Sequence, residues 1–423
     1  MTADPSEWLP PMSNSALEGT RSRRDWKTQL LVGRRGRPFG NVANAISALR
    51  HAPEWQGVLY FNESTLETLA KAAPPFERAP AVPFVWADGH DVLTAAWLQH
   101  QDISINREIA GQAVQAVARE HCFHPIRDYL DSLTWDGIKR IDDWLSLYLG
   151  ADPSDYVRAV GTRWLTGGVA RVYRPGVKND TCLILEGPQG LLKSTALRIL
   201  AGDEFFSDDI ADLGSKDSVL QTRGVWIIEL AELDAMTRPE SSRVKAFISR
   251  QVDRVRPPYG RRPIQMPREC IFVGTTNKTD YLKDETGGRR FWPVECGRID
   301  MAALERDRDQ LWVEARERFR ANGKWWFDSP ALIDAATTEQ RNRYEGDPWD
   351  EKIREWIHSR ESTSVPDVLN KCLEKKAESW TQTDQNRVAR ALRAAGWIRY
   401  RESGGSRPWR YRPGPSVGPS FPV

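Results

Sequence analysis

The stretch of sequence that decides the fold is Leu185-Glu186-Gly187-Pro188-Gln189-Gly190-Leu191-Leu192-Lys193-Ser194-Thr195. It follows an apolar run, Thr181–Leu185, with the length of a buried strand, and it leads into a helix expected from about Ser194 to Leu200. A glycine-rich turn between a strand and a helix, ending in Lys-Ser, is typical of a phosphate-binding P-loop. The loop amides and the helix N-terminus would then face the phosphates of a nucleotide.

The loop residues have expected parts in holding ATP and Mg²⁺. Lys193 is expected to reach the β- and γ-phosphates, and the hydroxyl of Ser194 is expected to bind Mg²⁺. The residues expected to contact the nucleotide are Gly187, Pro188, Gln189, Gly190, Leu191, Leu192, Lys193, Ser194 and Thr195. A chance glycine-rich turn and a true P-loop with weak hydrolysis are the alternatives.

Two further apolar runs, Val225–Leu230 and Cys270–Gly274, alternate with segments long enough for helices, which predicts a parallel α/β sheet. Ligands of such sheets lie outside the carboxyl ends of the strands. We expect Glu229 to bind Mg²⁺ through water and Glu232 to polarise the attacking water. Asn277 is expected to orient that water or to contact the γ-phosphate. An asparagine selected for its turn geometry is the alternative.

A pair of arginines, Arg289 and Arg290, follows two glycines near the end of this region. Either arginine has an acidic neighbour in its own chain, Asp284 or Glu285, with which it could form an ion pair. In a ring of subunits, one of them would instead reach the γ-phosphate held by the neighbour, as an arginine finger.

The formal net charge is only +2, so nucleic-acid binding would depend on local basic patches. Two stretches are strongly basic, Arg21–Arg37 and Arg243–Arg268, and each contains a single acid. In the second stretch, cations surround a tyrosine and a glycine, which suits phosphate contacts, base stacking and a hairpin tip. A solvated charged face is the alternative. The residues expected to contact DNA here are Lys245, Arg254, Arg256, Tyr259, Arg261 and Arg262.

The C-terminal region reads as a winged-helix domain. Glu351–Ile357, Val365–Leu373 and Thr383–Ala395 are predicted helices, and two strands joined through a Gly-Gly pair follow them. Thr383 or Asp384 is expected to cap the third helix. Its arginines Arg387 and Arg390 are expected to contact a DNA major groove. Docking of a replication protein is the alternative use of such a domain.

The predicted organisation is an α/β core flanked by helical regions and short tails. The segments are a disordered tail (1–20), a mostly helical and partly basic region (21–120), a helical lead-in (121–175), the ATPase core (176–300), a helical extension (301–347), the winged helix (348–413) and a second disordered tail (414–423).

Cysteine usage and hydropathy exclude several classes of protein. The five cysteines are scattered and odd in number, which favours reduced thiols in the cytoplasm. His121, Cys122 and His124 form one ligand-like cluster, but no second cluster is present to complete a tetrahedral metal site. No apolar run approaches the roughly 20 residues that a membrane helix needs, so no membrane partner is expected.

Together these segments resemble the virulence-associated protein E family of phages, plasmids and pathogenicity islands, which is related to superfamily 3 helicases. The resemblance covers about His124 to Glu295. Its most specific stretches are Pro125–Gly137, Leu185–Ser194, Val225–Leu233, Val244–Arg261 and Gly274–Val294. Leu192 departs from the family's pattern, because related loops have glycine just before the lysine. Glycine tolerates a positive φ and a close phosphate.

The resemblance implies an AAA+-like P-loop ATPase core that assembles into a homo-oligomer, with a hexamer among the arrangements considered. In superfamily 3 helicases, the segment corresponding to residues 245–262 reaches into the ring channel and contacts single-stranded DNA. The predicted function is therefore an ATP-dependent DNA helicase, translocase or replication initiator of a mobile genetic element. The alternative is a DNA-binding replication or regulatory protein whose P-loop hydrolyses ATP weakly because of Leu192.

Overall fold

The computed structural model describes residues 26–76, 80–210, 215–231, 238–256, 263–282, 288–343, 347–401 and 409–414. The chain divides into two compact units. The larger unit contains residues 1–279 and 286–342, and the smaller unit contains residues 280–285 and 343–423. Both predicted tails lie outside the described residues, except for Gly414.

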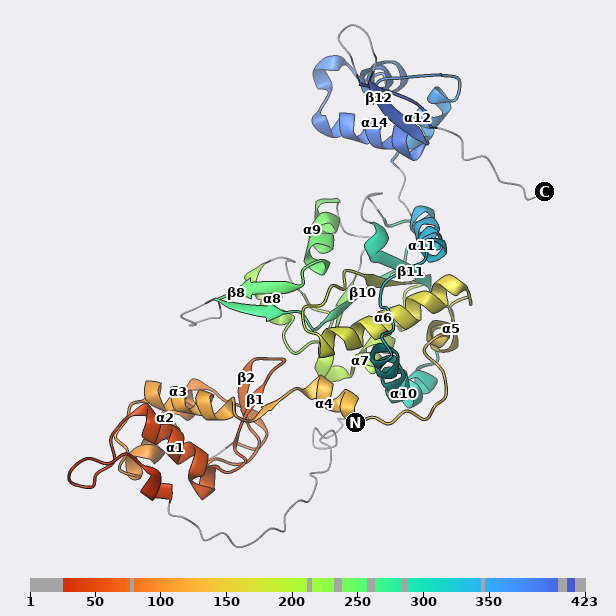
Figure 1. Cartoon of the computed structure of the whole chain (residues 1–423). Coiled ribbons are helices and arrows are strands. Elements are labelled where there is room, and N and C mark those ends of the chain that lie inside the picture. The colour runs from red at the N-terminus through yellow and green to blue at the C-terminus, as the bar shows by residue number, and fades with distance from the viewer. Residues whose placement is uncertain are drawn as a thin grey trace. The chain divides into compact units, whose positions relative to one another are not determined.

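A five-stranded parallel sheet forms the centre of the larger unit (Figure 1), with strand order β11-β5-β10-β7-β6. Its strands are β5 (Cys182–Glu186), β6 (Phe206–Ser207), β7 (Ile227–Leu230), β10 (Ile271–Thr276) and β11 (Phe291–Glu295). All residues of β5, β7 and β10 are buried, as expected for runs that read as continuously apolar. The predicted α/β fold with a parallel sheet is therefore confirmed.

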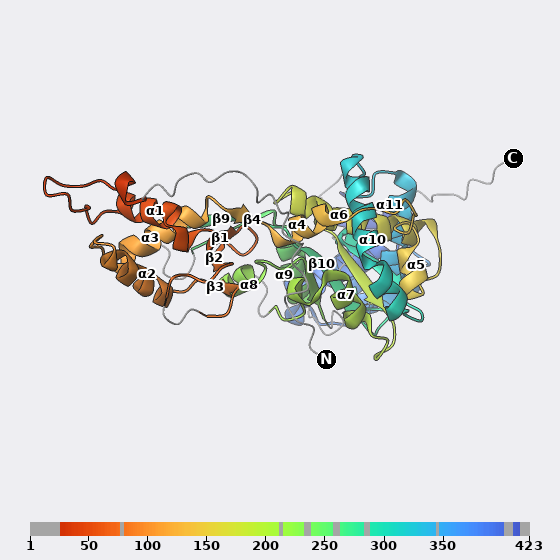
Figure 2. The same cartoon turned by 90° about the horizontal axis from the view of Figure 1, so that it is seen from below.

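Helices pack on both faces of this sheet. On one face, Leu185 and Val273 join the core cluster formed with α6 (Asp155–Tyr173) and α10 (Met301–Arg320), which lie side by side in Figures 1 and 2. On the other face, Phe272 packs edge-to-face against Phe247 of α9 (Arg238–Ile248), with ring centroids 5.8 Å apart. Because successive strand residues point to opposite faces, the neighbouring residues Phe272 and Val273 of β10 contact the helices on the two different faces.

Further helices and a hairpin surround this sheet. They are α4 (Pro125–Ser132), α5 (Trp144–Leu149), α7 (Lys193–Ala201), α8 (Lys216–Gln221), α11 (Pro330–Asn342) and the antiparallel hairpin of β8 (Val252–Val255) and β9 (Ile264–Pro267).

The N-terminal region, which the sequence predicts to be mostly helical, also contains a small sheet. Its helices are α1 (Val42–His51), α2 (Asp88–His100) and α3 (Arg107–Ala118), and its sheet has the order β3-β2-β1-β4. The strands are β1 (Leu59–Asn62), β2 (Glu67–Ala70), β3 (Phe84–Val85) and β4 (Cys122–Phe123). Strands of two to four residues are too short to show a reliable alternation of apolar and polar residues, so a helical reading prevailed.

The smaller unit contains the predicted succession of helices and a two-stranded ribbon. It comprises α12 (Asp350–Ile357), α13 (Val365–Asp367), the π-helix η7 (Val368–Cys372), α14 (Gln382–Ala394) and the antiparallel strands β12 (Trp397–Arg401) and β13 (Trp409–Pro413). The predicted cap of the third helix is wrong by position. Thr381 is the N-cap, and Asp384 completes a capping box by accepting a hydrogen bond from the Thr381 amide.

Among the described residues, no helix has both the length and the apolar character required to cross a lipid bilayer.

Candidate nucleotide-binding site

The strand order brings three predicted site segments together at the carboxyl end of the sheet. Strand β10 lies between β5 and β7, and all three run in the same direction. The chain leaves β5 towards β6 on one side, whereas it leaves β10 towards β11 on the other. In parallel sheets, ligands bind at such a reversal, outside the carboxyl ends of the strands. The Gly187–Leu192 loop, Glu229 and Asn277 all lie at this edge.

Lys193 is the first residue of α7, and its side chain turns back over the glycine-rich loop. Its Nζ donates to the carbonyl oxygens of Gly187 (2.6 Å) and Pro188 (3.0 Å) and to Oδ1 of Asn277 (3.2 Å). The residue is 7% exposed, and burial lowers the pKa of its ammonium group. No carboxylate among the described residues forms an ion pair with Lys193, so neutral oxygens hold its charge.

Ser194 and Thr275 both bond to Glu229. The Ser194 hydroxyl donates to Oε1 of Glu229 at 2.8 Å, and the Thr275 hydroxyl donates to the same oxygen at 2.6 Å. Glu229 is 2% exposed, and its Oε2 accepts no hydrogen bond from any described residue. A buried carboxylate oxygen without a donor is costly. A hydroxyl beside a carboxylate with a free oxygen fits Mg²⁺ or its bound water, because this ion prefers oxygen ligands.

Leu192 adopts the backbone conformation for which glycine is usual. Its φ of 65° and ψ of 29° are left-handed, and its side chain is 56% exposed. A left-handed conformation costs a residue with a Cβ atom roughly 1–2 kcal/mol. Leucine at this position, where related loops have glycine, therefore strains the backbone locally. Pro188, Gln189, Gly190, Ser194 and Thr195 are exposed around this position, while Leu191 is half-buried.

The predicted arginine pair lies at the opposite end of the sheet, where the strands begin. Arg289 and Arg290 precede β11, whose first residue pairs with Cys182 and whose last pairs with Glu186. At about 3.3 Å per residue, the five residues of β5 separate the amino and carboxyl ends of the sheet by roughly 13 Å. Arg290 donates to the Ser249 hydroxyl at 2.7 Å and lies 3.8 Å from an Asp180 oxygen. The partners suggested by the sequence, Asp284 and Glu285, lie outside the described residues.

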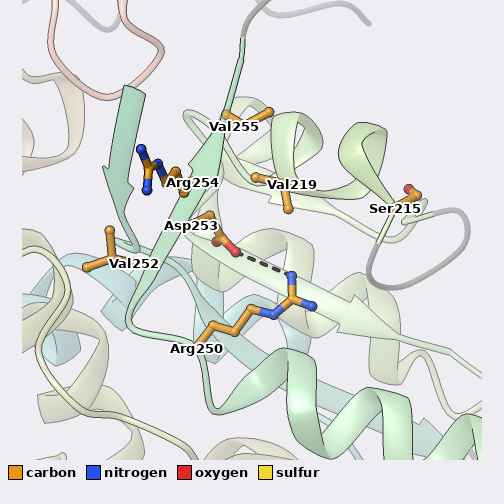
Figure 3. A pocket seen from close by; sticks show the side chains of 7 residues that line it. All are labelled: Ser215, Val219, Arg250, Val252, Asp253, Arg254 and Val255. Atoms are coloured by element: carbon orange, nitrogen blue, oxygen red, sulfur yellow. Dashed lines mark ion pairs between the residues drawn. The ribbon is translucent and has the colours of Figure 1, made fainter. Parts of the chain in front are cut away.

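The basic hairpin is only partly described. Glu232, Tyr259, Arg261 and Arg262 lie outside the described residues. Arg254 is exposed on β8, and Arg256 is exposed just after it. Figure 3 shows Asp253 and Val255 on one side of β8 and Arg254 on the other.

A buried carboxylate in this stretch pairs with two arginines. The buried Asp253 carboxylate pairs with Arg268 (2.5 Å) and with Arg250 (3.5 Å), the pair marked in Figure 3. Lys245 does not belong to an exposed basic surface. It is 8% exposed on α9, and its ammonium group lies 5.7 Å from the ring centroid of Phe291. This burial argues against its expected contact with DNA.

In the smaller unit, Arg387 and Arg390 hold an internal carboxylate. Arg387 donates to both oxygens of Asp347, at 2.8 and 2.7 Å, and Arg390 donates to Oδ2. Burial raises the pKa of Asp347, but the hydrogen bonds from Arg387 and the backbone and the charges of both arginines outweigh burial and bring the pKa to about 2. These guanidiniums thus have an anionic partner inside the unit, 40 or more positions away in the sequence.

The His-Cys cluster has a structural use at one of its members. His124 is 1% exposed and caps α4, where its Nδ1 accepts from the Arg127 amide, and its Nε2 lies 3.0 Å from Glu269. The residues in the described ranges contain no group of three or more His, Cys, Asp or Glu side chains suited to a metal ion. Thr275 joins the site through its bond to Glu229 but is not among the residues predicted for it. The only sequence signal for it was its place beside Asn277 at a strand end.

Known proteins resemble this chain in sequence or in structure. The model of the virulence-associated protein E-like domain matches residues 130–345, just over half of the chain. A solved apo structure of the C-terminal region of NrS-1 (residues 305–718) is similar at 12% identity and a TM-score of 0.44, covering 84% of this chain and 95% of that chain. An A-form apo structure of that region has a TM-score of 0.46 at 12% identity, with the same coverage. No curated protein gives a significant match.

Proposed function

This chain belongs to the virulence-associated protein E-like family, and we propose that it is an ATP-dependent DNA motor or replication initiator of a mobile genetic element. The proposal has the chain bind ATP with Mg²⁺ at the loop between β5 and α7. The observation that carries it is the meeting of Lys193, Ser194, Glu229 and Asn277 at the carboxyl edge of three adjacent strands.

The partners of Lys193 support a phosphate-binding role. Its ammonium group is held by two loop carbonyls and an amide oxygen, which are weaker partners than a phosphate anion. If the Lys193 ammonium group turned towards the β- and γ-phosphates, it would exchange neutral acceptors for charged ones. Oδ1 of Asn277 accepts a hydrogen bond from Lys193. Loss of this bond would leave the Asn277 amide available to contact the γ-phosphate or the attacking water.

Glu229 and Ser194 are the residues that would hold Mg²⁺. Bound there, the ion would supply positive charge to the phosphate oxygens during transfer. Thr275 would keep the Glu229 carboxylate in place through Oε1, leaving Oε2 directed to the ion or its water. Glu232 remains our proposed residue for polarising the attacking water, on the sequence pattern alone.

The position of Arg289 and Arg290 supports an oligomeric site. A side chain at the amino edge of the sheet is too distant to reach a γ-phosphate at the carboxyl edge of the same sheet. We propose that this pair acts on the nucleotide of a neighbouring copy. The test mixes Arg290→Ala with Lys193→Ala, each inactive alone, because a mixed oligomer contains some interfaces with both residues intact. Restored ATP hydrolysis supports the shared site, and inactivity of every mixture contradicts it.

Single-stranded DNA is the proposed ligand of the ring channel, contacted by Arg254, Arg256, Tyr259, Arg261 and Arg262. The smaller unit is proposed to be a winged helix that binds duplex DNA or a replication protein. Its helices α12 and α14, the helical segment 365–372 and the ribbon support this reading. Arg387 and Arg390 would read a duplex only after exchanging Asp347 for DNA.

A second candidate function is favoured by Leu192. Holding a leucine at a φ of 65° costs free energy, which would weaken the grip of the loop on the phosphates. The chain would then be a DNA-binding replication or regulatory protein that binds ATP but hydrolyses it weakly.

An ATP hydrolysis assay with and without single-stranded DNA separates these functions. The wild type, Leu192→Gly and Glu229→Gln are compared at saturating Mg²⁺. If the chain is a motor, DNA should stimulate ATP turnover. Glu229→Gln should then lower turnover by at least about tenfold, because it removes one charged ligand of the ion (~1.5 kcal/mol). The weak-hydrolysis candidate predicts slow turnover that Leu192→Gly accelerates. Turnover that is unchanged in Glu229→Gln would contradict both.

A further inference from the structure

A short hairpin at the start of the described chain carries a basic tip. We call residues 31–39 the arginine arm. The Phe39 amide donates to Leu31 and the Gly33 amide donates to Arg37, both at 2.9 Å, while Val32 and Pro38 form a bridge. The Gly36 amide closes the turn onto Gly33 at 2.9 Å.

The turn chemistry fixes which residues occupy the tip. Gly36 has a φ of 71°, the left-handed conformation that follows the turn in a three-residue hairpin loop. No atom lies within 4 Å of a Cβ built on Gly36, so glycine is needed here for its backbone and not for space. Arg34 and Arg35 are thereby held at the outermost point of the arm, with Arg37 beside them.

One buried side chain fixes the base of the arm. Asn44 of α1 is 1% exposed. Its Oδ1 accepts from the Leu31 amide at 2.8 Å, and its Nδ2 donates to the carbonyl oxygens of Leu31 and Phe39, both at 2.8 Å. Because this amide bonds to both strands, the arm is set on the helix before any ligand arrives. A preformed arm avoids much of the ordering cost of binding.

The arm carries positive charge that the rest of the region does not neutralise. Arg34, Arg35 and Arg37 are exposed, and no described residue forms an ion pair with them. Residues 26–53 contain no aspartate or glutamate at all. By contrast, the exposed Arg50 of α1 forms an ion pair with Glu120. Three guanidiniums on a narrow projection suit a regularly spaced anion.

We propose that the arginine arm binds the phosphate backbone of duplex DNA. Guanidinium groups match phosphate oxygens in charge and geometry, and the major groove of B-DNA is wide enough to admit a two-stranded ribbon. A duplex is favoured over a single strand because residues 34–37 at the tip include no aromatic side chain on which bases could stack. The one aromatic residue of the arm, Phe39, is 51% exposed but lies at the base. The arm gives the N-terminal region a DNA-binding role that requires neither ATP nor the smaller unit.

Binding of the full chain to a short duplex, measured without nucleotide as a function of salt, tests the arm. The triple variant Arg34→Ala, Arg35→Ala, Arg37→Ala should lower the salt slope by about 2.7, at roughly 0.9 per lost phosphate contact. Between about 50 and 200 mM salt, the wild type should then lose about 40-fold more affinity than the variant. Arg107→Ala removes an exposed arginine of the same region outside the arm and should lose less affinity than Arg35→Ala.

Two further variants test the shape of the arm and its independence from the nucleotide site. Gly36→Val keeps every arginine but strains the turn, and it should weaken duplex binding several-fold if the preformed shape matters. Lys193→Ala should bind the duplex like the wild type, so failure of the nucleotide site does not affect this test. Wild-type duplex binding in the triple variant overturns the proposal. So does a triple variant that loses only binding to vesicles of anionic lipid.

Discussion

Lys193 in the larger unit and Arg387 in the smaller unit are cations with different partners. Lys193 is held by three neutral oxygens at the edge of the sheet. Arg387 makes two hydrogen bonds to the Asp347 carboxylate, which Arg390 also contacts. A ligand phosphate would replace weaker partners at the first site, whereas at the second it would have to displace a buried anion that already binds both arginines.

A basic residue therefore indicates a ligand only when its own partners are known. Both regions looked alike in the sequence, as cations on a helix expected to face an anion. In the structure, the charge of Lys193 remains available, while those of Arg387 and Arg390 stabilise the start of the smaller unit through Asp347. Substitutions at the two sites should accordingly have different effects, and the largest is expected at the lysine.

Replacing Lys193 should abolish the proposed nucleotide site. Lys193→Ala is expected to weaken ATP binding by roughly 100-fold or more, because a charge-assisted contact worth about 3 kcal/mol is lost. Calorimetric titration with ATP and Mg²⁺ measures the effect. Lys178→Ala removes an exposed lysine just before β5, at the other edge of the sheet, and should leave the affinity unchanged. Equal affinities of Lys193→Ala and the wild type would remove the basis of the comparison.

Replacing Asp347 should affect stability, not nucleotide binding. Asp347→Asn leaves two partly buried guanidiniums without their anion, which we expect to lower the free energy of unfolding of the smaller unit by about 2 kcal/mol. Denaturant unfolding followed by circular dichroism measures this loss, and the exposed Glu351→Gln is the matched control. If the smaller unit uses these arginines on DNA, the same variant should gain duplex affinity.

Acid should weaken the same contact. The pKa of Asp347 is about 2 in the fold, below its ordinary value of 3.8. A lowered carboxyl pKa contributes stability that is complete above the unfolded pKa and is lost as the pH falls from about 4 towards 2. Thermal unfolding across this range should show a steeper loss in the wild type than in Asp347→Asn. Parallel pH profiles of the two proteins would show that Asp347 does not carry this effect.

Leu192 should give the smallest change. Leu192→Gly relieves the left-handed backbone and removes a side chain that is 56% exposed, so the free energy of unfolding should rise by about 1 kcal/mol. The neighbouring Leu191→Gly removes a half-buried side chain packed against the core and should have the opposite sign. A loss of stability in Leu192→Gly would show that the strain is compensated elsewhere.

The sheet and the strand-end residues could be predicted because their signals are local. β5, β7 and β10 are mostly apolar runs. Glu229 lies near the end of β7, Asn277 directly follows β10, and Lys193 follows β5 after the glycine-rich loop 187–192. Parallel pairing then brings their carboxyl ends together without further information.

The remaining features depend on contacts between distant residues. The partnership of Arg387 with Asp347 spans 40 positions, and the bond of Thr275 to Glu229 spans 46. No periodicity reveals such pairs. Lys245 looked like part of a basic surface because composition gives charge but not burial. The N-terminal sheet was missed because its strands are shorter than the repeat needed to recognise them.

The strand order also has a consequence for synthesis of the chain. β5 is fully buried between β10 and β11, yet both neighbours follow it by more than 80 residues. During translation, β5 therefore leaves the ribosome long before either strand that covers its edges. Unpaired apolar strands of this kind expose nascent chains to aggregation, and non-local pairing is slow. We expect nascent chains that end before β10 to require chaperones, and longer chains to depend on them less.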